Sequence, residues 1–98
     1  MKRDVYIGPD AEADLLGIWH YVFELGEAKD RADRAIRRLN TMFEQIAEFP
    51  SLGTLSPRWG PNVHAFQKDN YLVVYRVHPD KVEILRVSGA DPELWDLL

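Results

Sequence analysis

The apolar positions change their period near the middle of the chain, from helical spacing to strand alternation. A short apolar segment, Asp4–Ile7, is predicted to be a strand. Gly8 and Pro9 then indicate a helix start, with glycine at the N-cap and proline at the first helical position. Apolar residues recur every three or four positions over the next forty, which predicts helices over Pro9–Leu25 and Glu27–Phe49. A short glycine-containing connection makes them an antiparallel hairpin.

The second half of the chain alternates apolar and polar residues, as strands do. The proline- and glycine-rich segment Ser51–Pro61 is predicted to be a loop. Three strands are expected after it: Val63–Gln67, Tyr71–His78 and Lys81–Val87. The tail, Ala90–Leu98, is predicted to be a short helix with Asp91 as its N-cap. These elements indicate one α+β domain over residues 1–98, with an N-terminal strand and a helical hairpin packed on a small, mainly antiparallel sheet.

A tight turn at Pro79-Asp80 would set the register of the last two strands. The facing pairs would be Arg76 with Glu83, Val74 with Leu85, and Val73 with Arg86. A two-helix hairpin covers one face of such a sheet, so the other face would be left partly open. Its apolar residues would be Leu72, Val74, Leu85 and Val87. Exposed apolar surface of this kind is typical of a partner-binding site. Alternatively, the loop and the tail cover it with Trp59, Leu94 and Trp95.

The same register predicts a small cluster of polar residues on the opposite face. A turn at Asp69-Asn70 places His64 opposite Tyr75, and Arg86 would share their face. Histidine, tyrosine and arginine together could perform acid–base work on a phosphodiester. The alternative is a structural role, because a shift of one residue in either turn separates the three side chains.

Composition and charge narrow the functional classes. The chain has no cysteine and a net charge of −4, and none of its apolar runs approaches the length of a membrane span. We therefore expect a cytoplasmic protein without disulfides or thiol chemistry. The histidines are scattered, so neither a metal nor a cofactor is expected. Arginines 31, 34 and 37 each follow an acid four residues earlier, which favours a solvated, ion-paired helix face over a nucleic-acid surface. Arg38 lacks such an acid.

Several segments, in order, carry a resemblance to a known family. They are the helix opening Pro9–Leu15 with Ile18-Trp19-His20-Tyr21, the turn Phe49-Pro50-Ser51-Leu52-Gly53, and the paired strands Tyr71–Val77 and Val82–Val87. Together, across residues 4–88, they resemble ParE-type toxins of the RelE/ParE superfamily of bacterial toxin–antitoxin modules. The resemblance implies an α-helical hairpin on a small, mainly antiparallel sheet, and an antitoxin whose C-terminal segment wraps the toxin.

The resemblance also implies a target. ParE-like members poison DNA gyrase, whereas RelE-like members cut mRNA in the ribosome with clustered basic residues and an acid–base residue. Thr54 and His64 stand where the ParE pattern often has arginines, and the family's usual strand-end His-x-x-Arg-Asp is absent after Arg86. Few basic residues and an acidic charge disfavour contact with ribosomal RNA. We therefore expect a gyrase inhibitor, neutralised by a cognate antitoxin, rather than an enzyme.

Two alternatives stay open. One is a RelE-like, ribosome-dependent mRNA endoribonuclease, with His64, Tyr75 or Arg86 in acid–base or phosphate roles. The other is a non-toxic relative that acts as a binding module. Sequence-specific nucleic-acid binding is not expected, and a toxin–antitoxin hetero-oligomer could form. The candidate antitoxin- or target-binding residues are Leu72, Val74, Arg76, Leu85, Arg86, Val87, Arg58 and Trp59. Replacing Arg86 with alanine is expected to reduce toxicity while preserving the fold.

Overall fold

The computed structural model describes residues 2–26 and 29–89. The predicted tail helix at 90–98 and the predicted start of the second helix at Glu27 lie outside these residues. The elements are β1 (Asp4–Ile7), α1 (Pro9–Gly26), α2 (Lys29–Glu48), β2 (Thr54–Leu55), the 3-10 helix η1 (Pro57–Trp59), β3 (Val63–Lys68), β4 (Tyr71–Val77) and β5 (Lys81–Gly89). Within the described residues, the predicted strands and helices are confirmed, with ends that agree within two residues. The loop prediction for Ser51–Pro61 was wrong in part, since this segment also contains β2 and η1.

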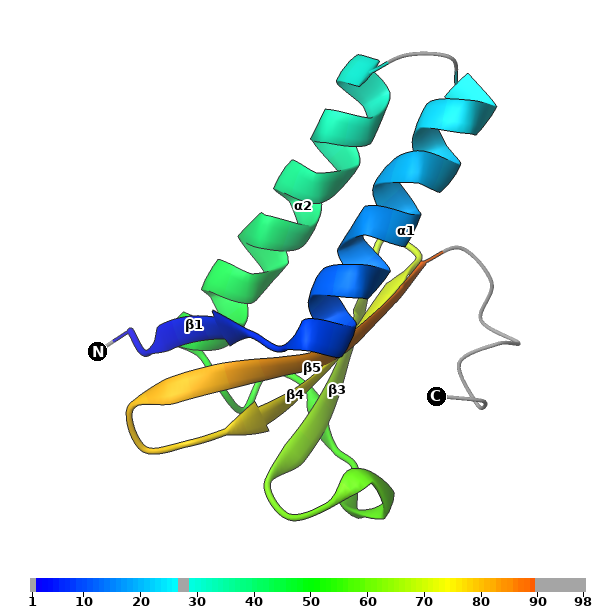
Figure 1. Ribbon diagram of the computed structural model, residues 1–98. Helices are drawn as coiled ribbons and strands as arrows, with labels where there is room; N and C mark the ends of the chain where they lie inside the picture. The colour runs from blue at the N-terminus through cyan, green and yellow to red at the C-terminus, as the bar shows by residue number, and fades with distance from the viewer. Residues whose placement is uncertain (1, 27–28, 90–98) are drawn as a thin grey trace.

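The five strands form one mixed sheet in the order β1-β5-β4-β3-β2. β1 runs parallel to β5, and the other neighbours are antiparallel. Both helices lie side by side on one side of the sheet, and the turn that contains η1 lies on the other side (Figure 1). We call the two sides the helix-covered face and the open face.

The core lies between α2 and the helix-covered face. One side of α2 is buried along its whole length, because apolar residues recur there at helical spacing. These residues are Ala32, Ala35, Leu39, Met42, Phe43, Ile46 and Ala47. The strands contribute Val73, Tyr75, Val82, Ile84 and Val87 to the same cluster. Burying each large apolar side chain stabilises the fold by roughly 1.5–3 kcal/mol.

The outer side of α2 carries the arginines that were predicted to be solvated. All four, Arg31, Arg34, Arg37 and Arg38, are exposed. The ion pair between two residues of the described part of this helix joins Lys29 to Asp33 at 2.9 Å. Arg34 was expected to pair with the Asp30 carboxylate, but its Nε donates to the Asp30 main-chain oxygen instead, at 3.4 Å.

The turn between β3 and β4 fixes the register of these two strands. Asp69 and Asn70 both have positive φ, 53° and 66°. Aspartate and asparagine tolerate this left-handed conformation, which suits a two-residue hairpin turn. The predicted pairing of His64 with Tyr75, and of Phe66 with Val73, is confirmed.

A β-bulge in β5 changes the pairing with β4. Next to the turn, the predicted pair of Arg76 and Glu83 is confirmed. Beyond Tyr75, which pairs with Ile84, the register shifts by one residue. The predictions for the next two pairs were wrong, since Val74 pairs with Arg86 and Val73 with Val87. Leu85 is the extra residue, and a bulge of this kind leaves no trace in the turn geometry from which the register was predicted.

The bulge moves Val87 to the other face of the sheet and moves Arg86 away from Tyr75. Val87 was predicted on the open face, but it is 3% exposed and belongs to the core under the helices. Arg86 was predicted beside Tyr75, but its partner Val74 points to the open face. None of the described helices is long and apolar enough to cross a membrane.

Candidate functional site

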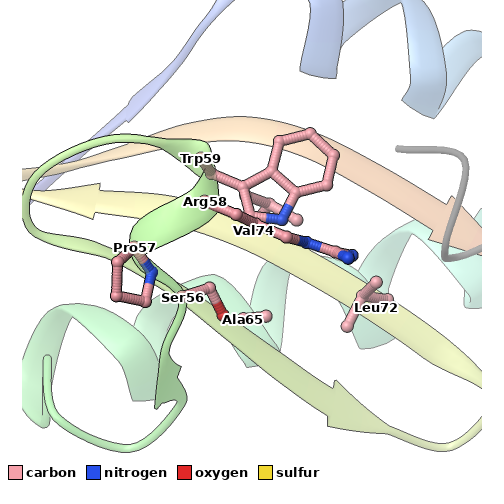
Figure 2. A pocket seen from close by; sticks show the side chains of 7 residues that line it. All are labelled: Ser56, Pro57, Arg58, Trp59, Ala65, Leu72 and Val74. Atoms are coloured by element: carbon pink, nitrogen blue, oxygen red, sulfur yellow. The ribbon is translucent and has the colours of Figure 1, made fainter.

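The open face contains a groove of about 360 Å³ between η1 and strands β3 and β4. Its lining is mainly apolar, with one charged side chain. The lining residues are Ser56, Pro57, Arg58, Trp59, Ala65, Leu72 and Val74. In Figure 2 the Trp59 indole stands above β4, and the Arg58 side chain extends towards Leu72.

Local hydrogen bonds hold η1 in place beside the sheet. The Ser56 N–H donates to the Val63 carbonyl at 2.8 Å, and the Gly60 N–H donates to the Pro57 carbonyl at 3.0 Å. Gly60 has φ of 121°, where residues with a side chain are strained. A Cβ there would also lie 2.9 Å from Nη2 of Arg76. Arg76 in turn donates from Nε to the Pro61 carbonyl at 3.3 Å, so this guanidinium supports the turn.

The predicted binding residues fall into two groups. Arg58, Trp59, Leu72 and Val74 line the groove, and Arg76 supports its wall. The other three, Leu85, Arg86 and Val87, do not line the groove. Leu85 lies at the bulge, Arg86 forms an ion pair with α1, and Val87 lies in the core. The open face is therefore smaller than predicted and is concentrated on β3 and β4.

The two groove residues of η1 interact with each other. The Arg58 guanidinium carbon lies 5.4 Å from the centre of the Trp59 ring, a cation–π arrangement. Arg58 is exposed, whereas Trp59 is partly buried. The groove thus combines an aromatic wall with one positive charge at its rim, which suits an apolar segment that carries acidic residues.

Tyr75, a candidate acid–base residue, is fully buried on the helix-covered face. Its hydroxyl donates to the Pro50 carbonyl at 2.7 Å and accepts the Gly53 N–H at 2.9 Å. Burial raises the pKa of this phenol, and the hydrogen bond from Gly53 opposes the rise. Glycine is required at position 53, because a Cβ would lie 2.8 Å from the Ala65 carbonyl oxygen. The phenol therefore anchors the chain after α2.

His64 and Tyr75 are brought together as the sequence predicts. Their rings stack with centroids 5.4 Å apart and an angle of 13° between their planes. Nδ1 of His64 is buried and has no hydrogen-bond partner among the described residues. Arg86, the third member of the predicted cluster, does not join these two residues, because the bulge places it opposite Val74.

Arg86 is instead held by Asp14 of α1. Its Nε and Nη2 donate to the two carboxylate oxygens at 2.9 and 3.1 Å. The Val87 N–H donates to the same carboxylate at 2.9 Å. The hydrogen bond with Asp14 raises the pKa of Arg86 further. Sequence reasoning missed this contact, because Asp14 fits the pattern of acids at a helix start and its partner is 72 residues away.

In the described part of the chain, His, Asp and Glu do not gather in groups of three or more, so these residues provide no set of metal ligands there. The site is therefore an apolar groove with a basic rim on the open face, while the stacked His64–Tyr75 pair belongs to the helix-covered face.

A helical hairpin on one face of a mixed five-stranded sheet is the RelE/ParE toxin fold. The structure of the chromosomal ParDE toxin–antitoxin system from P. aeruginosa matches with a TM-score of 0.75 and 18% identity, over 92% of this chain and 98% of that one. The crystal structure of the RelBE2 toxin–antitoxin complex from Mycobacterium tuberculosis matches with a TM-score of 0.64 and 19% identity, over 92% and 100% of the two chains. At such identities these matches show the fold alone.

Sequence comparison defines the family. The model of the ParE toxin family, described as the ParE toxin of the type II toxin–antitoxin system parDE, matches residues 5–91. Toxin RelE3 of Caulobacter vibrioides is 33% identical over 89 residues, which cover 90% of this chain and 95% of that toxin. The chain belongs to the ParE toxin family, and is a toxin of the type II toxin–antitoxin class. The predicted resemblance is confirmed.

Proposed function

We propose that this toxin acts by binding a protein target, DNA gyrase, and that a cognate antitoxin neutralises it through the open face. The match to the ParE toxin family over residues 5–91 supports the target, because ParE-like members of the superfamily poison gyrase and trap cleaved DNA. The net charge of −4 supports a protein target over ribosomal RNA, whose binding depends on neutralising phosphates.

The side chains of Tyr75 and Arg86 are already held by contacts within the protein. This observation favours a gyrase inhibitor over the nuclease alternative. A general acid or base must reach the proton that it transfers. The Tyr75 phenol is fully buried and already makes two hydrogen bonds to the chain after α2. Arg86 forms a two-point ion pair with Asp14, so binding a phosphate would require it to leave that partner.

The groove supports the antitoxin as partner. The Trp59 wall and half-buried Leu72 offer apolar contacts above buried Val74, and Arg58 offers a cation at the rim. Trp and Arg are the residue types that most often dominate binding energy at interfaces. We therefore expect an antitoxin segment that places apolar side chains in the groove and an acidic residue beside Arg58.

The experiment that tests the target uses the purified toxin with purified gyrase and supercoiled plasmid. Accumulation of linear, gyrase-linked DNA at rising toxin concentration is the expected result. A translation reaction without gyrase, with the same toxin concentrations, is the matched control. If mRNA is cut in the translation reaction while the plasmid stays intact in the gyrase reaction, the target is the ribosome and not gyrase. No effect in either reaction would favour a non-toxic binding module.

The antitoxin interface is tested by a pair of charge reversals. Arg58→Glu places a negative charge at the groove rim, while Arg31→Glu makes the same change on the exposed outer side of α2. The protein encoded beside the toxin gene serves as the antitoxin. We expect Arg58→Glu to weaken its binding about tenfold, because like charges across an interface are unfavourable, and Arg31→Glu to change it little. Equal effects of the two reversals would move the interface away from the groove.

A further inference from the structure

The short helix η1, which carries Arg58 and Trp59, has little of its own to fix its position. It is three residues long, none of these residues is buried, and its N-cap residue Ser56 makes no side-chain capping hydrogen bond. A single helical turn is not stable alone, because nucleation costs more than one hydrogen bond returns. The position of η1 beside the sheet is therefore set by contacts of the chain around it.

The turn after η1 adopts a backbone conformation that needs such contacts. Gly60 and Asn62 have positive φ values, 121° and 60°. For asparagine this left-handed conformation is sparsely populated, and it persists where the surrounding structure holds it. The Val77 N–H donates to the Asn62 carbonyl at 3.0 Å, and Nε of Arg76 donates to the Pro61 carbonyl at 3.3 Å. The turn, and η1 with it, is thus fastened to β4.

The Arg76 guanidinium meets a different neighbour with each of its three nitrogens. Nε bonds to the turn, and Nη2 lies so close to Gly60 that a Cβ there would come within 2.9 Å of it. Nη1 lies 3.8 Å from Oε1 of Glu83 on β5. Arginine can make such a junction because its donors form a rigid planar fork, whereas a lysine ammonium is a single point charge. The guanidinium therefore joins the turn to the neighbouring strand.

Glu83 is held from a second side. It is the cross-strand partner of Arg76, and the same Oε1 lies 2.9 Å from Nε2 of His78. The side chains of Arg76, Glu83 and His78 are 32%, 25% and 32% exposed, so water and salt screen their contacts less than at an open surface. None of these three described side chains lines the open-face groove. Residues outside the groove thus hold the turn that carries its aromatic wall.

We propose that Arg76 is a positioning residue for antitoxin binding. Held by Glu83, it places η1 so that Arg58 and Trp59 face the antitoxin, and it does not itself touch that partner. This assignment rests on the proposed function, in which the open-face groove binds the antitoxin. It replaces the direct contact that the sequence suggests for Arg76. The affinity for the antitoxin is then controlled in part from β5, although no residue of this strand lines the groove.

Fluorine NMR of the toxin labelled with fluorotryptophan tests the positioning without a partner. The variants Trp19→Phe and Trp59→Phe identify the signals of these two residues. Arg76→Lys keeps the charge but loses the fork, and Arg37→Lys makes the same change on the exposed outer side of α2. We expect Arg76→Lys to shift or broaden the Trp59 signal and to leave the Trp19 signal in place, while Arg37→Lys changes neither. An unchanged Trp59 signal in Arg76→Lys would overturn the proposal.

The affinity for the antitoxin, the protein encoded beside the toxin gene, separates positioning from direct contact. We expect Arg76→Lys to weaken binding about fivefold in the natural chain. When Arg58 and Trp59 are both replaced by alanine, the same change should weaken it less than about twofold, because a residue that acts through others is not additive with them. Equal losses in the two backgrounds would show that Arg76 contacts the antitoxin directly, which also overturns the proposal.

The charge reversal Arg58→Glu distinguishes a failure of this proposal from a failure of the proposed function. If Arg58→Glu weakens antitoxin binding and Arg76→Lys does not, Arg76 is not a positioning residue and the groove remains the antitoxin's surface. If neither change weakens binding, the antitoxin binds elsewhere and both proposals fail. Far-UV circular dichroism checks the fold of each variant, and Glu83→Gln replaces Arg76→Lys in both experiments if that variant is unfolded.

Discussion

The two faces of the sheet are built from the same strands but are closed in different ways. On the helix-covered face, Val73 and Tyr75 are completely buried under α2, and the Tyr75 hydroxyl makes two hydrogen bonds. On the open face, the three-residue η1 leaves a groove beside Leu72 and Val74. One face therefore stabilises the fold, while the other keeps an accessible, mainly apolar groove.

This difference predicts where a substitution has its effect. A residue on the helix-covered face contacts many atoms that cannot rearrange, so its loss reduces the free energy of unfolding. Leu72, in the open groove, is only partly buried, so its loss should alter binding more than stability. The following predictions test that separation, from the largest expected effect to the smallest.

A matched pair of leucines measures the difference directly. Leu39 of α2 is completely buried, whereas Leu72 is half-buried in the groove. Leu39→Ala should lower the free energy of unfolding by about 3 kcal/mol, and Leu72→Ala by about 1 kcal/mol, because a cavity costs most where the surroundings are packed. Urea unfolding followed by circular dichroism gives both values. Similar losses would show that the open face is packed as tightly as the core.

The Tyr75 hydroxyl tests whether the polar anchor of the helix-covered face stabilises the fold. Tyr75→Phe leaves the Pro50 carbonyl and the Gly53 N–H without their partner. We expect a loss of about 2 kcal/mol in the free energy of unfolding, because unpaired buried polar groups are costly. Tyr21→Phe, at an exposed tyrosine of α1, is the control and should be nearly neutral. If both changes were neutral, the anchor would be dispensable.

The same tyrosine gives the fold a pH dependence in the alkaline range. Because burial raises its pKa above the ordinary value of 10.0, the unfolded chain loses this proton before the folded one. Stability from this group is complete below that value and falls as the pH rises through the raised pKa. Unfolding curves between about pH 8 and about pH 11 should show this fall in the natural chain. The Tyr75→Phe variant should lack that component of the slope.

The ion pair of Asp14 and Arg86 should have a smaller effect, because part of it is exposed. The two side chains are 17% and 39% exposed. A double-mutant cycle with Asp14→Ala and Arg86→Ala should give a coupling energy of about 1 kcal/mol. The toxicity of Arg86→Ala, which is predicted to be reduced, should then be compared with the toxicity of Asp14→Ala at an equal folded fraction of the two variants. If only Arg86→Ala reduces toxicity, the guanidinium itself contacts the target, and equal reductions would indicate that its position in the ion pair matters.

The smallest effect is expected at the far end of the helical hairpin, away from both faces. Asp33 accepts hydrogen bonds from Nε1 of Trp19 at 3.0 Å and from Nζ of Lys29 at 2.9 Å, and the Trp19 bond is the main cause of its lowered pKa. Stability from this carboxylate is present above its ordinary pKa of 3.8 and is lost as the pH falls through the lowered value. Asp33→Asn should therefore lower Tm slightly at neutral pH. Thermal unfolding in strong acid should show no difference between the two proteins.

Much of the fold follows from local sequence signals. Gly8-Pro9 marks the start of α1, the apolar stripe marks α2, and Asp69-Asn70 sets the β3–β4 register. Each signal acts within a few residues, where backbone preferences and side-chain spacing decide the structure. The groove was predicted in part for the same reason, since Leu72 and Val74 alternate with core residues on one strand.

The parts that were missed depend on contacts between distant segments. The bulge at Leu85 lets Val82, Ile84 and Val87 all reach the core, and their uneven spacing was its one signal in the sequence. The ion pair of Asp14 with Arg86 joins α1 to β5, and no local pattern relates the two residues. Tertiary packing selected both, so the spacing of residues along one element was insufficient to predict them.

The parallel pairing of β1 with β5 imposes an order of events on folding. β1 is made first, but its partner begins at Lys81, 77 residues after Asp4. The helical hairpin can form from neighbouring segments, whereas this edge of the sheet must close the longest loop in the domain, a slow step. A ribosome that is still making the chain therefore carries a nascent protein whose sheet is incomplete until β5 has emerged.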